Sequence, residues 1–200
     1  MSTVLYIKAN PKTAYESKTF KISDKFIETY QKYHPYDEII TLDLYKENID
    51  FLTEEDVRIH ENNEVEKKDN PMRKYALQFK NADKYVFAEP MWNLGVPAIL
   101  KAYIDYISIP NITFGYNENG SVGLCQGKKA VNITTSGGDY SEGIADEWEF
   151  CDKYLRAIMA LFGVIDYTAI KAYNLDVMGM DVDAIMNKAI NEAEELAKKF

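Results

Sequence analysis

Short runs of hydrophobic residues alternate with longer amphipathic stretches along the whole chain. Five of these runs have the length and composition of buried β-strands. The strands are predicted at 3–8, 38–43, 84–89, 130–135 and 165–172. Strands that alternate with helices are typical of a parallel sheet with helices on both faces. The pattern therefore predicts an α/β fold around a five-stranded parallel sheet.

Helices are predicted where hydrophobic residues recur at intervals of three and four. The expected helices cover about 17–32, 72–81, 96–107, 148–162 and 182–197. The third carries Pro97 in its first turn, where a proline is well tolerated. The hydrophobic stripes of the last two helices are expected to face the core, and the first of these stripes begins at Trp148.

Two stretches interrupt this alternation. Residues 108–128 contain Asn119-Gly120 between two short hydrophobic runs, which predicts a β-hairpin. Residues 45–71 form a long, charged and weakly periodic stretch. Insertions of this length are uncommon unless they line a site or an interface, but a solvated surface loop explains this one equally well.

Length and charge limit the classes of protein. The 200 residues are expected to form one domain, 1–200. The 23 basic and 32 acidic residues give a net charge of -9, and no window has the basic face that binds a phosphate backbone. We therefore expect no nucleic acid among the partners.

The sequence lacks the usual signals of a metal site, a disulfide framework and a membrane segment. Cys125 and Cys151 form no CxxC pair and are expected to be buried, and both histidines lie far from them in polar surroundings. The N-terminus has no basic region followed by an apolar run, and no segment is long enough to span a membrane. We expect a soluble, cytoplasmic protein without a metal.

The loops after the first, third and fourth predicted strands carry the candidate chemistry. In a doubly wound sheet these loops meet where the strand order reverses, and ligands bind there. The first loop ends in Ser17 and Thr19 at a helix start, where hydroxyl and free N–H groups suit a phosphate. It has neither a Walker motif nor GxGxxG, which favours one phosphate monoester. A serine that only caps the helix is the alternative.

The second loop, Pro90-Met91-Trp92-Asn93-Leu94, brings a thioether, an indole and an amide together. These groups suit a planar ring that forms hydrogen bonds. The alternative is that Met91 and Trp92 are core residues at the end of a strand.

The third loop, Thr135-Ser136-Gly137-Gly138, contains two adjacent glycines. They would let the main chain approach a flat ligand and expose its amide donors. A plain turn explains the glycines equally well. It leaves unexplained why all three loops follow predicted strands in the order expected for a ligand site.

Motifs along nearly the whole chain resemble those of a known family. They are Val4-Leu5-Tyr6-Ile7, Ser17-Lys18-Thr19, Pro90-Met91-Trp92-Asn93-Leu94, Pro97-Ala98-Ile99-Leu100-Lys101, Thr113-Phe114, Gly127-Lys128-Lys129 and Thr135-Ser136-Gly137-Gly138. The family is that of the FMN-dependent NADH azoreductases, also described as FMN-dependent NADH:quinone oxidoreductases. The resemblance implies a flavodoxin-like three-layer sandwich with strand order 2-1-3-4-5.

The resemblance also implies an FMN site made by these three loops. The first loop matches the family's phosphate loop, the second lies under the isoalloxazine, and the third lies at the pyrimidine edge of the ring. The residues expected to bind FMN are Asn10, Ser17, Lys18, Thr19, Pro90, Met91, Trp92, Asn93, Leu94, Thr135, Ser136, Gly137 and Gly138. Asn10 stands where some relatives have serine, and Trp92 stands where others have tyrosine.

The activity that the resemblance implies is a ping-pong transfer of hydride from NADH, through N5 of FMN, to quinones or aromatic azo compounds. No catalytic side chain is expected. Family members are homodimers with flavin sites at the interface, so residues of 108–128 or of the helix ending at Phe162 are expected to complete a partner's pocket. Two alternatives stay open: a flavodoxin-type carrier that passes single electrons to protein partners, and a flavodoxin-like module without flavin.

Overall fold

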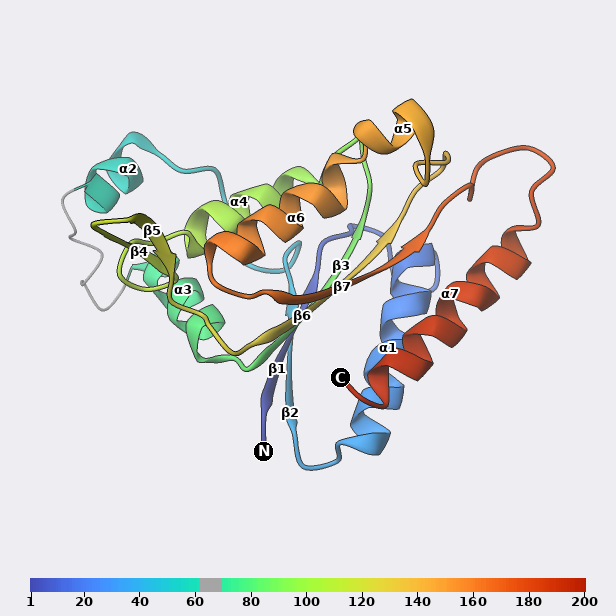
Figure 1. The fold of residues 1–200 in the computed structure, drawn as a ribbon, viewed down its shortest axis with the longest axis horizontal. Helices are drawn as coiled ribbons and strands as arrows, with labels where there is room; N and C mark the ends of the chain where they lie inside the picture. The colour runs from blue at the N-terminus through green and yellow to red at the C-terminus, as the bar shows by residue number, and fades with distance from the viewer. Residues whose placement is uncertain (62–69) are drawn as a thin grey trace.

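A five-stranded parallel sheet lies at the centre of the protein, between two layers of helices (Figure 1). The computed structural model describes residues 1–61 and 70–200. The strands are β1 (Thr3–Lys8), β2 (Glu38–Asp43), β3 (Lys84–Pro90), β6 (Lys129–Thr135) and β7 (Asp166–Ala172), in the order β2-β1-β3-β6-β7. The predicted order is confirmed, because β4 and β5 belong to a separate hairpin. β7 begins one residue after the predicted Ile165, whose side chain is exposed.

Each face of the sheet has its own layer of helices. One layer is α1 (Lys18–Tyr33) and α7 (Val182–Ala197), and the other is α3 (Pro71–Asn81), α4 (Ala98–Ile107) and α6 (Phe150–Leu161). Alternate side chains of β1 enter the two cores. Val4 and Tyr6 pack with residues of α1 and α7, whereas Leu5 and Ile7 pack with residues of α3, α4 and α6. The alternation of strands and helices that the sequence predicts therefore produces two hydrophobic cores.

The prediction that Trp148 belongs to a helical stripe facing the core is wrong. A short helix, α5 (Gly143–Glu147), ends at Trp148, and α6 begins two residues later. Between them, the carboxylate of Glu149 caps α6 by accepting a hydrogen bond from the backbone N–H of Asp152. The chain changes direction at this cap, so Trp148 is left 47% exposed.

The predicted hairpin is confirmed. β4 (Phe114–Asn117) and β5 (Gly120–Gly123) pair in antiparallel register. The base of the hairpin packs against the end of α6, where a Cβ added to Gly123 would lie 2.1 Å from the backbone nitrogen of Gly163. Only glycine fits this close approach of two backbones.

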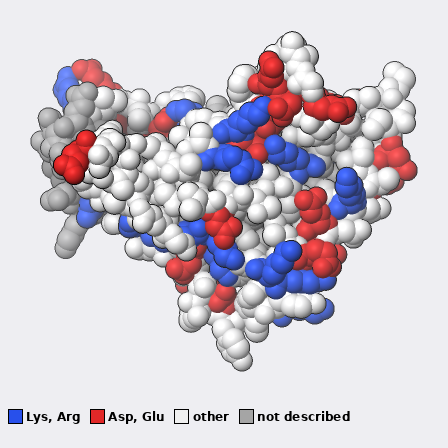
Figure 2. Space-filling view, in the orientation of Figure 1, with Lys and Arg blue, Asp and Glu red and all other residues white. Residues whose placement is uncertain are grey.

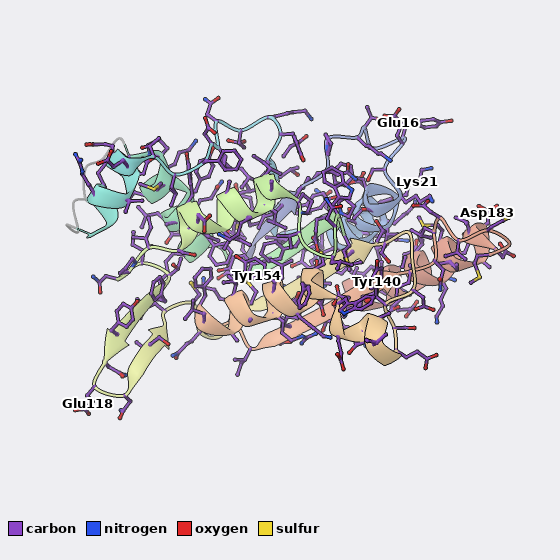
Figure 3. All side chains as sticks on the ribbon, turned by 90° about the horizontal axis from the view of Figure 1, so that it is seen from above. Glu16, Lys21, Glu118, Tyr140, Tyr154 and Asp183 are labelled. Carbon is purple, nitrogen blue, oxygen red and sulfur yellow. The ribbon has the colours of Figure 1, made fainter. Side chains whose placement is uncertain are left out.

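The hairpin lies far from the loops that carry the candidate chemistry. Figure 3 shows Glu118, at the hairpin tip, at one end of the molecule and Glu16 and Tyr140 toward the other end. The hairpin therefore contributes nothing to the pocket of its own chain.

The stretch 45–71 is described as far as residue 61 and contains α2 (Glu54–Glu61). Its first part packs on the helices of one layer, where the Tyr75 hydroxyl donates to Glu47 Oε2 at 2.7 Å. The part of the prediction that falls on residues 62–69 lies outside the described residues. None of the described residues of this stretch lines the pocket at the carboxyl end of the sheet.

Cys125 and Cys151 are buried and free, as predicted. Within residues 1–61 and 70–200, no group of three His, Cys, Asp or Glu side chains is placed to hold a metal ion. In the same part of the chain, no helix is long and apolar enough to cross a membrane.

Basic and acidic side chains lie side by side on the face seen in Figure 2.

Candidate functional site

An open cavity of about 160 Å³ lies at the carboxyl end of the sheet, where the loops after β1, β3, β6 and β7 meet. Its lining residues are Asn10, Lys12, Glu16, Lys18, Thr19, Pro90, Met91, Trp92, Thr135, Ser136, Gly137, Leu175 and Asp176. Most of the predicted binding residues are therefore brought together. Ser17, Asn93, Leu94 and Gly138 are outside this lining; Ser17, Asn93 and Gly138 each follow or precede a lining residue in the chain, and Leu94 lies two residues after Trp92.

The first wall of the pocket is the start of α1, and Ser17 is its N-cap. The Ser17 hydroxyl accepts hydrogen bonds from the backbone N–H of Phe20 at 3.1 Å and from the Asn10 amide at 3.0 Å. Asn10 is itself buried and accepts from the backbone N–H of Lys12 at 3.0 Å. The alternative that Ser17 caps the helix therefore matches the geometry, while its predicted contact with a phosphate stays a prediction.

Two backbone amides at this helix start are free to bind an anion. The N–H groups of Lys18 and Thr19 have no acceptor among the described residues, as expected for the first turn of a helix. They lie at the positive end of a 16-residue helix. The Thr19 hydroxyl lies 2.6 Å from the Thr135 hydroxyl and so joins the loops after β1 and β6.

Four pocket residues escaped the sequence prediction: Lys12, Glu16, Leu175 and Asp176. Lys12 lies within the predicted phosphate loop, so a basic residue there was an available signal. Leu175 and Asp176 follow β7, whose loop the switch-point rule does not include. The Lys18 ammonium donates to the carbonyl of Leu175 at 2.7 Å and to Asp176 Oδ1 at 3.1 Å. This contact brings the loop after β7 over the pocket.

Acidic and basic side chains share this end of the pocket. The Thr13 hydroxyl donates to Glu16 Oε2 at 2.8 Å, and this hydrogen bond lowers the pKa of the Glu16 carboxyl. The carboxylates of Glu16 and Asp176 therefore lie beside the ammonium groups of Lys12 and Lys18. Attraction of an anion to this end depends more on the helix amides than on an excess of positive charge.

The second wall is a tight turn after β3. The backbone N–H of Trp92 donates to the Gly95 carbonyl at 2.9 Å, and the N–H of Gly95 donates back at 3.1 Å. The two central residues, Asn93 and Leu94, have φ values of 49° and 72°. Positive φ at both central positions is the geometry of a type I′ turn, and it is strained for leucine. Strain of this kind is concentrated at functional sites.

This turn exposes groups that a ring ligand could use. The amides of Asn93 and Leu94 have no acceptor in the described part of the chain. Trp92 is 40% exposed, so the alternative that it is a core residue is wrong. The Met91 N–H donates to the Thr135 carbonyl at 2.8 Å, and the Phe150 N–H donates to the Leu94 carbonyl at 3.0 Å. The turn is thus tied to β6 on one side and to the start of α6 on the other.

The third wall is the loop after β6, whose carbonyls and amides have different roles. The carbonyls of Ser136, Gly137 and Gly138 accept hydrogen bonds from the backbone of residues 174–176. The amides of the two glycines have no acceptor within the described ranges. A Cβ on Gly137 would lie 2.7 Å from Asp176 Oδ2, so a larger residue would push the exposed Asp176 side chain away from its place beside Lys18. The glycines therefore leave two donors available beside the pocket.

Next to the turn, an apolar groove of about 540 Å³ opens on the surface. Gly95, Val96, Lys101, Phe150, Lys153 and Tyr154 line it. Phe150 is 53% exposed. Large hydrophobic side chains in exposed grooves are typical of binding surfaces.

Comparison with known proteins identifies the family. Residues 2–197 match the model of a family described as having a flavodoxin-like fold. The FMN-dependent NADH:quinone oxidoreductase 2 of Clostridium acetobutylicum is 58% identical to this chain over 200 residues, which is 100% of both chains. The chain belongs to the flavodoxin-like FMN-dependent NADH:quinone oxidoreductase family. The resemblance that the sequence motifs indicate is confirmed.

Other members of the family agree with this assignment. The FMN-dependent NADH:quinone oxidoreductase of Caldicellulosiruptor saccharolyticus is 53% identical over 201 residues and over the full length of both chains. An azoreductase from Bacillus anthracis has a TM-score of 0.92 and 33% identity, with full coverage of both chains. An FMN-dependent NADH-azoreductase from the same species, solved in complex with FMN, has a TM-score of 0.90 and 29% identity, covering 100% of this chain and 99% of the other.

Proposed function

We propose that this protein is an FMN-dependent NADH:quinone oxidoreductase that also reduces aromatic azo compounds. One observation carries the proposal. Each of the three loops around the pocket leaves two backbone amides without an acceptor among the described residues: Lys18 and Thr19, Asn93 and Leu94, and Gly137 and Gly138. A ligand with a phosphate at one end and several ring acceptors at the other would use all three pairs.

FMN has this arrangement of groups. The start of α1, with Lys12 and Lys18 nearby, would hold the phosphate. The amides of Gly137 and Gly138 would donate to the carbonyl oxygens of the pyrimidine edge. When bound, FMN supplies transfer of hydride from NADH, through its N5 atom, to a quinone or an azo compound in a ping-pong cycle.

We propose that the side chains of the pocket bind and orient FMN and do not transfer protons. The titratable residues that line the described pocket are Lys12, Glu16, Lys18 and Asp176. The first three lie at the start of α1, and the Asp176 carboxylate, which also contacts Gly137, is paired with Lys18 at 3.1 Å. The ring end is lined by the Trp92 side chain, which is open to solvent. Protonation of the reduced product is therefore assigned to water.

The apolar groove supports a homodimer with the pocket at the subunit interface. It begins at Gly95, in the turn that forms one wall of the pocket, so a second copy seated there would also cover the ring end. Phe150→Glu is expected to shift the sedimentation coefficient toward that of a monomer, because a charge would be buried in the interface. Phe51→Glu is the control, since Phe51 is 72% exposed and lies outside the groove. A dimer that persists in Phe150→Glu would contradict this interface.

The cytoplasmic location stays a prediction.

The experiment for the activity is an anaerobic titration of the FMN-saturated protein with NADH. Bleaching of the oxidised-flavin absorption band without a semiquinone, followed by its return on addition of a quinone, is the expected result. A semiquinone that accumulates would favour the single-electron carrier. Protein that takes up no FMN would overturn the proposal and favour the flavin-free module.

A further inference from the structure

A fully buried carboxyl lies directly behind the pocket. Glu89 is the next-to-last residue of β3, and Pro90, which follows it, lines the pocket. The side chain is 0% exposed. Its Oε1 atom accepts a hydrogen bond from Cys151 Sγ at 3.5 Å, whereas Oε2 has no partner among the described residues.

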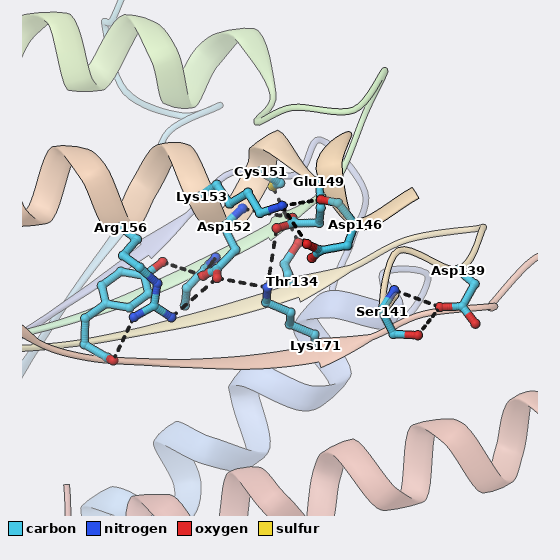
Figure 4. Close-up of polar contacts among 12 residues, drawn as sticks. Thr134, Asp139, Ser141, Asp146, Glu149, Cys151, Asp152, Lys153, Arg156 and Lys171 are labelled. Atoms are coloured by element: carbon cyan, nitrogen blue, oxygen red, sulfur yellow. Dashed lines mark hydrogen bonds and ion pairs between the residues drawn. The ribbon is translucent and has the colours of Figure 1, made fainter. Parts of the chain in front are cut away.

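Two more buried carboxyls, those of Glu149 and Asp152, lie nearby and form the ion pairs of the cluster (Figure 4). Lys171 Nζ lies 3.4 Å from Glu149 Oε2 and 2.9 Å from Asp152 Oδ2. Arg156 lies 3.5 Å from the same Asp152 oxygen. No described cation pairs with Glu89. Glu89 is therefore the carboxyl without a counter-charge, and a lone charge in the core costs far more than protonation of the group.

The groups that face Glu89 act on its pKa in both directions, and burial has the largest effect. Burial raises the pKa of Glu89 well above its usual value; contacts with Cys151 and Asn132 offset part of this rise, and the nearby charges of Asp152 and Glu149 add to it. From β7, the Tyr167 hydroxyl faces the same cluster and donates to Asp152 Oδ1 at 2.7 Å. A protonated Glu89 is what this set of neighbours favours.

The proton would satisfy two oxygens at once. Glu89 pairs with Thr134 in the β3–β6 register, and Asn132 lies two residues earlier on the same face of β6. The Oδ1 atom of Asn132 is also buried without a partner in the described structure. A proton on Glu89 Oε2 would place a donor on the same face of the sheet as this unpartnered acceptor.

The cluster is connected to the turn that forms the second wall of the pocket. Cys151, the partner of Glu89, lies in the first turn of α6, and this turn of helix is capped by Glu149. The residue between them, Phe150, holds the turn through its N–H bond to the Leu94 carbonyl. The contacts therefore run without interruption from the end of β3 to the start of α6 and back to the turn.

We infer that Glu89 is a positioning residue of the pocket: as a neutral acid it joins the end of β3 to the start of α6 and so keeps the Trp92–Gly95 turn in its binding shape. The relevance of this shape to FMN rests on the proposed function. The neutral state of Glu89 and its link to α6 do not rest on the proposed function.

The first test is the unfolding equilibrium of Glu89→Gln and of the unchanged protein as a function of pH. A buried acid with a raised pKa contributes its full stability below the ordinary glutamate pKa of 4.5 and loses it as pH rises toward the raised value. Glutamine cannot ionise. The folded-to-unfolded ratio of the unchanged protein should therefore fall relative to Glu89→Gln by about tenfold per pH unit from about pH 5 upward. The exposed Glu192→Gln is the control and should run parallel to the unchanged protein. If the stability of Glu89→Gln also ran parallel to that of the unchanged protein across this pH range, the inference that Glu89 is neutral would be overturned.

The second test is hydrogen exchange of the segment 148–155 without FMN. Glu89→Leu keeps a similar volume but removes the acceptor for Cys151 and the donor inferred for Asn132, so exchange of this segment should become faster. Glu89→Gln retains an acceptor for Cys151 and a donor for Asn132, so it should restore slow exchange. Equal exchange in all three proteins would overturn the positioning role.

The third test is FMN affinity, measured by quenching of flavin fluorescence. We expect Glu89→Leu to bind FMN at least about tenfold more weakly, and Glu89→Gln within about twofold of the unchanged protein. Unchanged affinity in Glu89→Leu would also contradict the role of Glu89. Should the unchanged protein bind no FMN while the first two tests give the expected results, the proposed function fails and the inference about Glu89 stands.

Discussion

The two sides of the pocket are held by different forces. On the β1–α1 side, Ser17, Asn10 and the Thr19–Thr135 pair are joined by hydrogen bonds between neutral groups. On the β3–α6 side, a strained turn is tied to α6 by one hydrogen bond from Phe150, and buried charged groups lie behind it. The first side needs little more than a well-capped helix. The second side is costly to build, and we expect its geometry to matter more for the ligand than for the fold.

The largest effect should come from the charged cluster behind the turn. Asp152→Asn is expected to lower the free energy of unfolding by about 3 kcal/mol, because it removes a buried anion that pairs with both Lys171 and Arg156. Denaturant unfolding at neutral pH measures this. The control is Asp166→Asn, whose ion pair with Lys129 lies on the surface at 3.8 Å and should contribute less than about 1 kcal/mol. Equal losses in the two variants would mean that the cluster behind the turn stabilises the fold no more than a surface ion pair does.

The pH dependence of Asp152→Asn should have the opposite sign to that of Glu89→Gln. Burial acts to raise the pKa of Asp152, but hydrogen bonds from Lys171 and Tyr167, together with the Lys171 charge, lower it overall. Its contribution to stability is therefore present above the ordinary aspartate pKa of 3.8 and is lost as pH falls toward the lowered value. The advantage of the unchanged protein over Asp152→Asn should shrink below about pH 4. An advantage that grows in acid would mean that the carboxyl is not stabilised as an anion.

Trp92→Ala should affect the ligand rather than the fold. The side chain is 40% exposed, so the free energy of unfolding should change by less than about 1 kcal/mol. FMN affinity is expected to fall by about tenfold, since stacking on an aromatic side chain contributes about 1–3 kcal/mol in comparable base-binding sites. Trp148→Ala is the matched control, because Trp148 is similarly exposed but does not line the pocket. Unchanged FMN affinity together with unchanged turnover in Trp92→Ala would exclude the role of Trp92.

Ser17→Ala tests the two roles that the sequence leaves open for this residue. Loss of the cap should lower the free energy of unfolding by about 1 kcal/mol, and Ser17→Thr should retain most of it. If the hydroxyl only caps the helix, FMN affinity should fall no more than stability does. A fall in affinity much larger than the loss of stability would instead favour direct contact with the phosphate.

The smallest effect is expected at the turn itself. Asn93 has a φ of 49°, which asparagine tolerates better than alanine and glycine adopts without strain. Asn93→Ala should lower the free energy of unfolding by less than about 1 kcal/mol, whereas Asn93→Gly should cause no loss. Thermal unfolding of the two variants measures the difference. Equal stability of both would show that the turn relaxes and carries no strain.

The fold was predictable because its signals are local. Runs such as Val4-Leu5-Tyr6-Ile7 mark a strand wherever they occur, and Asn119-Gly120 marks a hairpin turn. The prediction for Trp148 was wrong because the hydrophobic spacing continues across the helix cap at Glu149. The spacing alone does not show that one helix ends and another begins there. The pocket loops were found from their place after strands. Asp176 was missed because its loop reaches the pocket through tertiary contacts, with Lys18 and with the backbone of residues 136–138.

The sequence by itself determined the elements, their order and the three loops that meet at one end of the sheet, because hydrophobic period and turn chemistry act over a few residues. Only the tertiary structure decided which amides stay free, that Ser17 is engaged as a cap and that Trp92 is exposed. The tertiary structure alone also decided the environment of Glu89. The charge of a buried acid depends on how many anions and cations surround it, and here they come from β3, α6 and β7, far apart along the chain.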